Sequence, residues 1–279
     1  MSKKMLKIDC EVPISEEPTP IWREMLWPAE WLRLRSSEVY RGAGLPRGRG
    51  QRVMLVPGFL SSETSLDELH RWLERLGYSV RSSGISRNDD CPDVMLARLL
   101  EAAGSVVEES GERVRLIGHS LGGTLARAAS VRRPDLVSHV VTLGSPIGDS
   151  RVHPLILKLA RMVGNARPTP DQQPRVHEDH YHDGTCMCEL AGILQQPAPS
   201  EVTLASIFSK TDGVVDWRSS QEEPPGTNIE VKGTHIGLVV NVAVYRAIAR
   251  LLAVGAARRR RFDRRRLSWK ELDDHVGLC

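Results

Sequence analysis

The sequence predicts an α/β fold built on a mostly parallel, doubly wound sheet. Short apolar runs rich in β-branched residues alternate along the chain with longer segments whose apolar residues recur at helical spacing. Parallel strands need such crossover helices, and right-handed units leave the carboxyl ends of the strands at one edge of the sheet. With 279 residues, of which 41% are hydrophobic, the chain is long enough for one large domain.

The expected elements follow one another from residue 46 to residue 255, which we take as the main domain. Strand patterns cover residues 52–56, 78–81, 114–117, 137–143, 202–208 and 228–231. Helical patterns cover residues 65–77, 93–109, 124–129 and 237–254. The alternation fails over residues 147–200, where prolines and histidines are common. We expect this insert to form a cap or lid above the carboxyl edge of the sheet.

An N-terminal arm with a Trp-rich helical segment, residues 1–45, precedes the main domain. The segment contains Trp22, Trp27 and Trp31 and is divided into two helical pieces by Pro28. We expect the three rings to pack on the outside of the core. The alternative is that they form an apolar wall of a ligand funnel or a membrane-facing patch.

A glycine-flanked serine occupies the turn after the expected strand over residues 114–117. Residues 118–122, Gly-His-Ser-Leu-Gly, match the pattern G-x-S-x-G. A serine on so sharp a turn stands clear of the sheet at the start of a helix, where backbone N–H groups and the helix dipole stabilise developing negative charge. We therefore interpret Ser120 as a nucleophile rather than as part of an ordinary Gly-Ser turn.

A serine hydroxyl becomes a good nucleophile only when a neighbouring base takes its proton and an acid orients that base. Asp212 follows the expected strand over residues 202–208, and His235 follows the one over residues 228–231. Both residues are therefore expected at the same sheet edge as Ser120, in the chain order serine, acid, histidine.

Asp216 is a second candidate for the acid. A purely structural role for Asp216 would be an ion pair with Arg218. Asp212, in contrast, comes first after the strand and is followed by Gly213, which allows a tight turn. The two valines that follow would shield a hydrogen bond from water, so Asp212 is the preferred acid.

These motifs resemble those of the α/β-hydrolase superfamily, specifically its lipase/esterase branch. The resemblance implies that Ser120 is the nucleophile, His235 the base and Asp212 the acid. It also implies an oxyanion hole made by the backbone N–H groups of Phe59 and Leu121. Many relatives have His-Gly at positions 57 and 58, where this chain has Pro-Gly. The resemblance covers residues 52–254 and rests on the motifs at 57–59, 118–122, 144–146, 211–215 and 235–237.

The resemblance implies a serine-dependent carboxylic-ester hydrolase that works through an acyl-enzyme and needs no cofactor. Two alternatives stay open here: an acyltransferase with the same fold and triad, and a protein that binds a ligand without turning it over. Leu155, Leu159 and Met162 lie at helical spacing in the insert. We expect them to contact an apolar acyl group of a small-molecule or lipid ester.

The insert also contains a cluster of possible zinc ligands. No pair among them has a spacing that completes a standard zinc site, so we interpret them as part of a polar lid and expect no bound metal. The cluster consists of His177, His180, His182, Cys186 and Cys188.

Positive charge gathers in a basic tail, residues 256–279. This tail has seven arginines and one lysine against four acidic residues, in a chain whose net charge is +3. The main domain is thus not a basic nucleic-acid binder, whereas the run at 258–266 suggests docking on an anionic membrane surface. No signal peptide or membrane span is visible in the sequence, so we expect a cytoplasmic protein, peripheral to the membrane if the tail docks. The oligomeric state is left open.

Overall fold

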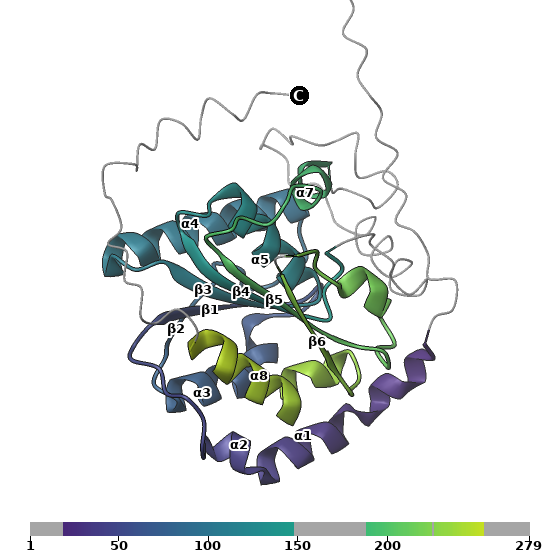
Figure 1. Ribbon diagram of the computed structural model, residues 1–279. Helices are drawn as coiled ribbons and strands as arrows, with labels where there is room; N and C mark the ends of the chain where they lie inside the picture. The colour runs from purple at the N-terminus through teal and green to yellow at the C-terminus, as the bar shows by residue number, and fades with distance from the viewer. Residues whose placement is uncertain (1–18, 148–187, 225, 254–279) are drawn as a thin grey trace, which may run out of the picture.

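The computed structural model describes residues 19–147, 188–224 and 226–253, and its described strands form one parallel sheet (Figure 1). The strand order is β2-β1-β3-β4-β5-β6, and every neighbouring pair is parallel. This confirms the predicted fold class. The strands are β1 (Arg52–Val56), β2 (Ser79–Arg81), β3 (Val114–His119), β4 (Val137–Leu143), β5 (Thr203–Ser209) and β6 (Thr227–Val231).

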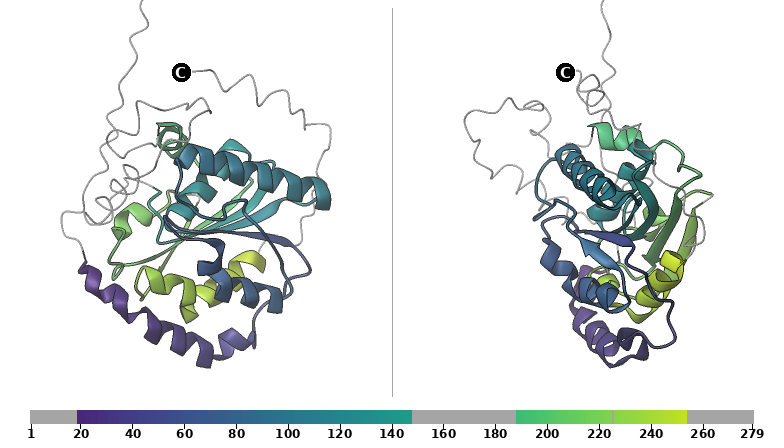
Figure 2. Two further views of the ribbon diagram at one scale, coloured as in Figure 1. Left: turned by 180° about the vertical axis from the view of Figure 1, so that it is seen from behind. Right: turned by 90° about the vertical axis from the view of Figure 1, so that its left-hand side faces the viewer.

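Helices cover both faces of the sheet (Figures 1 and 2). Successive side chains of β1 enter different cores: Val53 and Leu55 pack on one face, and Met54 and Val56 on the other. Because both faces are buried, the strands read as continuous apolar runs. One face carries α4 (Pro92–Ser110), α5 (Leu121–Arg132) and α7 (Cys188–Leu194); the other carries α1 (Trp27–Ser36), α2 (Glu38–Arg41), α3 (Asp67–Arg75) and α8 (Val242–Ala253).

The closing helix is divided where the sequence predicted one helix over residues 237–254. A 3-10 helix, η5 (Ile236–Val240), comes first, and Asn241 separates it from α8. The side-chain Oδ1 of Asn241 accepts a hydrogen bond from the backbone N–H of Ala243 at 2.8 Å. This N-cap starts a new helix axis, which leaves the short η5 directly after His235.

The end of the expected cap is part of the main domain. Leu190 and Ile193 of α7 are buried in the core with residues of α4 and α5. The backbone N–H of Leu190 also donates to the Asp93 carboxylate of α4 at 3.1 Å. Residues 148–187, with Leu155, Leu159 and Met162, lie outside the described residues, as do residues 1–18 and the basic tail.

The Trp-rich segment forms a 3-10 helix, η1 (Ile21–Leu26), followed by α1. The expected packing holds for Trp31, which lies against the core. Trp22 and Trp27 are instead 63% and 39% exposed. None of the helices in the described part of the chain is long and apolar enough to cross a bilayer.

Candidate active site

Ser120 occupies the sharp turn between β3 and α5. Its φ of 53° and ψ of −129° place a non-glycine residue in a region that costs about 1–3 kcal/mol of strain. The surrounding backbone enforces this conformation, because a Cβ at Gly122 would overlap the carbonyl oxygens of Val56 and Pro57. A Cβ at Gly118 would likewise overlap the first turn of α5. The two glycines thus allow the close approach that the sequence pattern predicted.

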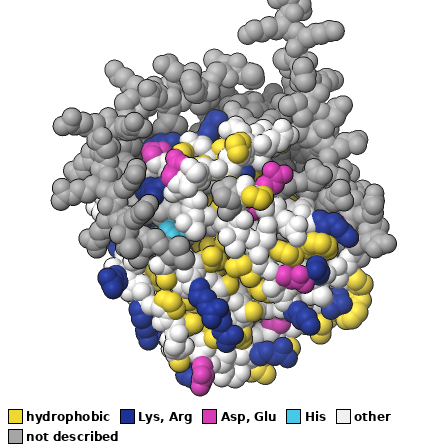
Figure 3. All heavy atoms as spheres, viewed as in Figure 1, with side chains coloured by type: hydrophobic (Ala, Val, Ile, Leu, Met, Phe, Trp, Pro, Cys, Tyr) yellow, Lys and Arg dark blue, Asp and Glu magenta, His cyan; other side chains and the backbone are white. Residues whose placement is uncertain are grey.

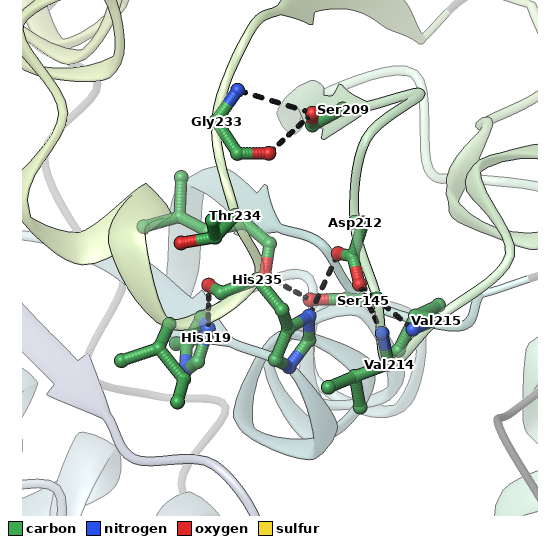
Figure 4. A network of polar contacts seen from close by, with 12 residues as sticks. His119, Ser145, Ser209, Asp212, Val214, Val215, Gly233, Thr234 and His235 are labelled. Carbon is green, nitrogen blue, oxygen red and sulfur yellow. Dashed lines mark hydrogen bonds and ion pairs between the residues drawn. The ribbon is translucent and has the colours of Figure 1, made fainter. Parts of the chain in front are cut away.

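Asp212 and His235 form a buried pair on the loops after β5 and β6. His235 Nδ1 lies 2.7 Å from Asp212 Oδ2 (Figure 4), and the two side chains are 6% and 1% exposed. The other oxygen, Oδ1, accepts hydrogen bonds from the backbone N–H groups of Val214 and Val215 at 2.8 Å each. Both carboxylate oxygens are therefore engaged, and the Asp212 side chain is fixed toward the imidazole.

Asp216 lies in a different environment from Asp212. It caps the 3-10 helix η4 (Trp217–Ser220), where its Oδ1 accepts from the backbone N–H of Arg218 at 3.0 Å. It also pairs with the Arg218 guanidinium at 3.4 Å. The geometry thus brings Asp212, and not Asp216, to the Nδ1 of His235.

The charges around His235 favour its protonated form. Burial lowers the pKa of His235, but the charge and the hydrogen bond of Asp212, with a further contribution from the charge of Glu24, raise it above the ordinary value of 6.5. Since Nδ1–H is donated to Asp212, Nε2 is the nitrogen that is open to accept a proton from a nucleophile.

The end of β4 and the residue after it contact both Ser120 and the Asp212–His235 pair. Its backbone N–H donates to the carbonyl oxygen of Leu143 at 2.9 Å. At the next residue, a Cβ on Gly144 would lie 2.9 Å from Asp212 Oδ2 and 3.2 Å from His235 Nδ1. No hydrogen bond joins Ser120 directly to His235 in the described structure. Bonds of this kind are often long without substrate and tighten when it binds.

The loop after β1 lies against Ser120, as its expected role requires. A Cβ on Gly58 would be 3.1 Å from Ser120 Cβ, which places the following residue, Phe59, beside the serine turn. Leu121, the other expected oxyanion donor, is the first residue of α5. Both backbones therefore lie next to Ser120.

Asn88 fixes the Phe59 loop, and sequence reasoning missed it. Its Nδ2 donates to the carbonyl oxygen of Pro57 at 2.8 Å, and its own backbone carbonyl accepts from Leu60 N–H at 2.7 Å. Leu60 has a φ of 57°, so the loop is held in a conformation that few side chains adopt. A buried asparagine outside any expected element leaves no periodic signal in the sequence.

The described residues contain no group of three or more His, Cys, Asp or Glu side chains that suits a metal ion. His177, His180, His182 and Cys186 lie outside that part of the chain, and only the backbone of Cys188, in α7, is described. The expectation of no bound metal therefore stays a prediction.

A cavity of about 470 Å³ opens beside the residues that precede His235, but it is lined by none of Ser120, Asp212 and His235. Its walls come from η1, α1, Thr211 in the loop after β5, the loop after β6 and the start of α8. Figure 3 shows basic side chains among hydrophobic ones on the half of the surface where α1 and α8 lie. We therefore do not assign this cavity to the reacting part of a substrate.

This arrangement of a strained serine turn and an Asp–His pair at one edge of a parallel sheet is typical of serine hydrolases. Residues 53–218 match the sequence model of the family described as the alpha/beta hydrolase fold. The match covers more than half of the chain, so the protein belongs to the α/β-hydrolase family.

Solved structures of lipases and esterases share this fold. A monoacylglycerol lipase of Paleococcus ferrophilus is 20% identical with a TM-score of 0.52, over 75% of this chain and 96% of that chain. A metagenomic carboxyl esterase is 19% identical with a TM-score of 0.52, over 74% of each chain. A structure reported for the metagenome-derived lipolytic enzymes LipS and LipT is 16% identical with a TM-score of 0.50, over 75% and 96%. At these identities the likeness shows the fold alone.

Proposed function

We propose that the protein is a serine-dependent carboxylic-ester hydrolase of the lipase/esterase type. The observation that carries the proposal is the buried Asp212–His235 pair at the same sheet edge as the strained Ser120. Lipases and esterases among the proteins of similar fold are consistent with this reaction.

In the proposed reaction, Ser120 Oγ attacks the ester carbonyl carbon while His235 Nε2 takes the hydroxyl proton. The carbonyl oxygen becomes an oxyanion, which accepts hydrogen bonds from the N–H groups of Phe59 and Leu121. The C–O bond to the alcohol then breaks, and the departing oxygen takes the proton from His235. Throughout this step Asp212 holds the Nδ1–H and stabilises the imidazolium.

The acyl group is now bound to Ser120 as an ester. A water molecule gives a proton to His235 Nε2 and attacks the acyl carbon through a second tetrahedral intermediate. Collapse of that intermediate breaks the bond to Ser120 Oγ, which takes the proton back from His235. The products are one carboxylic acid and one alcohol, and the residues return to their starting state.

Two parts of the proposal concern residues outside the described structure. Leu155, Leu159 and Met162 would contact an apolar acyl chain, and the arginine-rich run at 258–266 would dock on an anionic membrane surface. Both proposals come from the sequence pattern alone.

The function is tested with a series of p-nitrophenyl esters from acetate to long acyl chains. The wild-type protein should hydrolyse at least one of them, and Ser120→Ala should reduce turnover to the uncatalysed rate. Ser130→Ala, at a buried serine of the helix that follows Ser120, is the matched control and should keep its activity. Equal rates in the wild type and Ser120→Ala would contradict the proposal. Free acid as the product in the presence of a competing alcohol distinguishes hydrolysis from acyl transfer.

A further inference from the structure

The carboxylate of Glu24, in η1, is buried between the loops that carry Asp212 and His235. The residue is 6% exposed. Its Oε1 accepts hydrogen bonds from the backbone N–H of Gly213 at 2.8 Å and of His235 at 2.9 Å. Its Oε2 accepts from the backbone N–H of Ile236 at 2.8 Å. One side chain from the N-terminal segment thus holds three N–H groups of two loops that follow different strands.

From this arrangement we infer that Glu24 is a positioning residue for the catalytic triad, which ties the loop of the acid to the loop of the base. The inference rests on the proposed roles of Asp212 and His235. A carboxylate is suited to this task because it only accepts hydrogen bonds, and bonds to a charged acceptor are stronger than neutral ones.

The bonds act where small displacements matter most. The backbone N–H of His235 lies next to the Cα that carries the imidazole. The hydrogen bond to Glu24 therefore fixes the position of this Cα. The N–H of Gly213 directly follows Asp212, so the same carboxylate also fixes the position of the Asp212 backbone. A displacement of about 1 Å between groups that must meet in a reaction can lower the rate about 10²-fold.

A second carboxylate of the N-terminal segment provides a natural comparison. Glu30 of α1 accepts a hydrogen bond from the backbone N–H of Thr234 at 2.8 Å. It holds the same loop one residue earlier, but among the described residues no hydrogen bond joins it to His235 or to the loop of Asp212. Glu30 therefore anchors the loop of His235, as Glu24 does, but it does not link this loop to the loop of Asp212.

Glu24 also affects the proton equilibrium of His235. Within the described part of the chain, the ionisable groups that face His235 are Asp212 from the loop after β5, Glu24 from η1 and His119 from β3. His119 stays neutral, because burial and the nearby His235 lower its pKa to about 3. The charges of Asp212 and Glu24 both raise the pKa of His235, so removing the charge of Glu24 should lower it.

The test compares Glu24→Gln with Glu30→Gln in the full-length protein. Glutamine keeps the size of the side chain but places an NH2 group against a backbone N–H. In Glu24→Gln we expect kcat to fall about 10- to 100-fold with little change in KM, as for misplaced reacting groups. The acid limb of the kcat/KM profile should also move to lower pH. Glu30→Gln should leave that limb at the wild-type pH.

A second readout does not depend on catalysis. NMR of the protein labelled with 15N-histidine gives the pKa of His235 directly, with His235→Ala used to assign the signal. A lower pKa in Glu24→Gln than in the wild type is the expected result. If no ester is hydrolysed by the wild type, the proposed function fails, while this titration still tests the action of Glu24 on His235.

Gly213→Ala approaches the same contact from the other side. A Cβ there would lie 3.0 Å from Glu24 Oε1 and 3.3 Å from the Cα of Ile21, so it should push Glu24 away and lower kcat, as Glu24→Gln should.

Circular dichroism confirms that each variant is folded. Wild-type kcat and an unchanged His235 pKa in folded Glu24→Gln would overturn the inference, as would equal losses in Glu24→Gln and Glu30→Gln without any change in that pKa.

Discussion

The side chain of His119 donates a hydrogen bond to the backbone of His235. His119 Nε2 lies 3.0 Å from the carbonyl oxygen of His235, and the two ring centroids are 4.6 Å apart (Figure 4). A carbonyl only accepts, so Nε2 carries the proton and Nδ1 carries none in the neutral ring. The residue next to Ser120, the proposed nucleophile, thus supports the loop of His235 from the side of β3.

Replacing His119 by leucine removes this donor and leaves the His235 carbonyl without its partner. We expect the free energy of unfolding to fall by about 1–3 kcal/mol, the cost of an unpaired polar group. His119→Gln retains an N–H donor on a flexible side chain and should lose less. Urea denaturation at pH 7 measures both variants. Equal stability of the leucine and glutamine variants would show that the hydrogen bond contributes nothing.

Activity should depend on the protonation of one histidine. His235 must be neutral to take the proton of Ser120, and its pKa is raised above 6.5. We therefore expect kcat/KM to rise with pH through a value above 6.5 and then to level off. The neutral His119 should add no second step above pH 4, because its pKa is about 3. A steady-state pH profile with a short-chain ester checks both points, and a limb below 6.5 would contradict the assigned charges around His235.

The acid that orients His235 can be identified by two matched substitutions. Asp212→Asn removes the negative acceptor at Nδ1 while keeping the shape of the side chain. We expect turnover to fall by up to about 10⁴-fold, as when a triad acid no longer fixes the histidine tautomer. Asp216→Asn disturbs the cap of η4 and the pair with Arg218, which lie away from Nδ1 of His235, so its loss should be far smaller. Reversed losses would make Asp216 the acid.

Asn88 should influence turnover through the loop that carries Phe59. Asn88→Ala removes the hydrogen bond to the Pro57 carbonyl, two residues before the expected oxyanion donor. We expect kcat to fall by up to about 10²-fold because that N–H is no longer held in place. Asn228→Ala is the control, since Asn228 makes the same kind of bond to the Glu222 carbonyl. If both variants keep wild-type kcat, the Asn88 bond does not position the loop.

The parts of the site that depend on local sequence could be predicted. The turn around Ser120 has its signal within five residues, because glycines at 118 and 122 are needed wherever a strand and a helix meet so closely. The two later loops could be located by the strands before them. Asn241 also carried a usable signal, since an asparagine before a helical run is a common N-cap and marks the break between η5 and α8.

Other parts of the site have no local signal. Glu24 stands in a segment whose tryptophans suggested packing, next to Arg23, and reads as an ordinary surface acid. Its partners are backbone N–H groups, which every residue except proline possesses, so no particular side chain identifies them. That this carboxylate is buried becomes visible only in the structure, where η1 packs against the loop after β6.

Glu24 and His235, which are joined by a hydrogen bond, are made at different times during synthesis. The two residues are separated by 211 positions in the chain. At about 5–20 residues per second, Glu24 is incorporated into the chain about 10 to 40 s before His235. From the synthesis of residue 120 until that of residue 235, the nascent chain contains the serine turn without the proposed base. If Ser120 and His235 act as proposed, a chain interrupted before residue 235 lacks the base and should not hydrolyse esters.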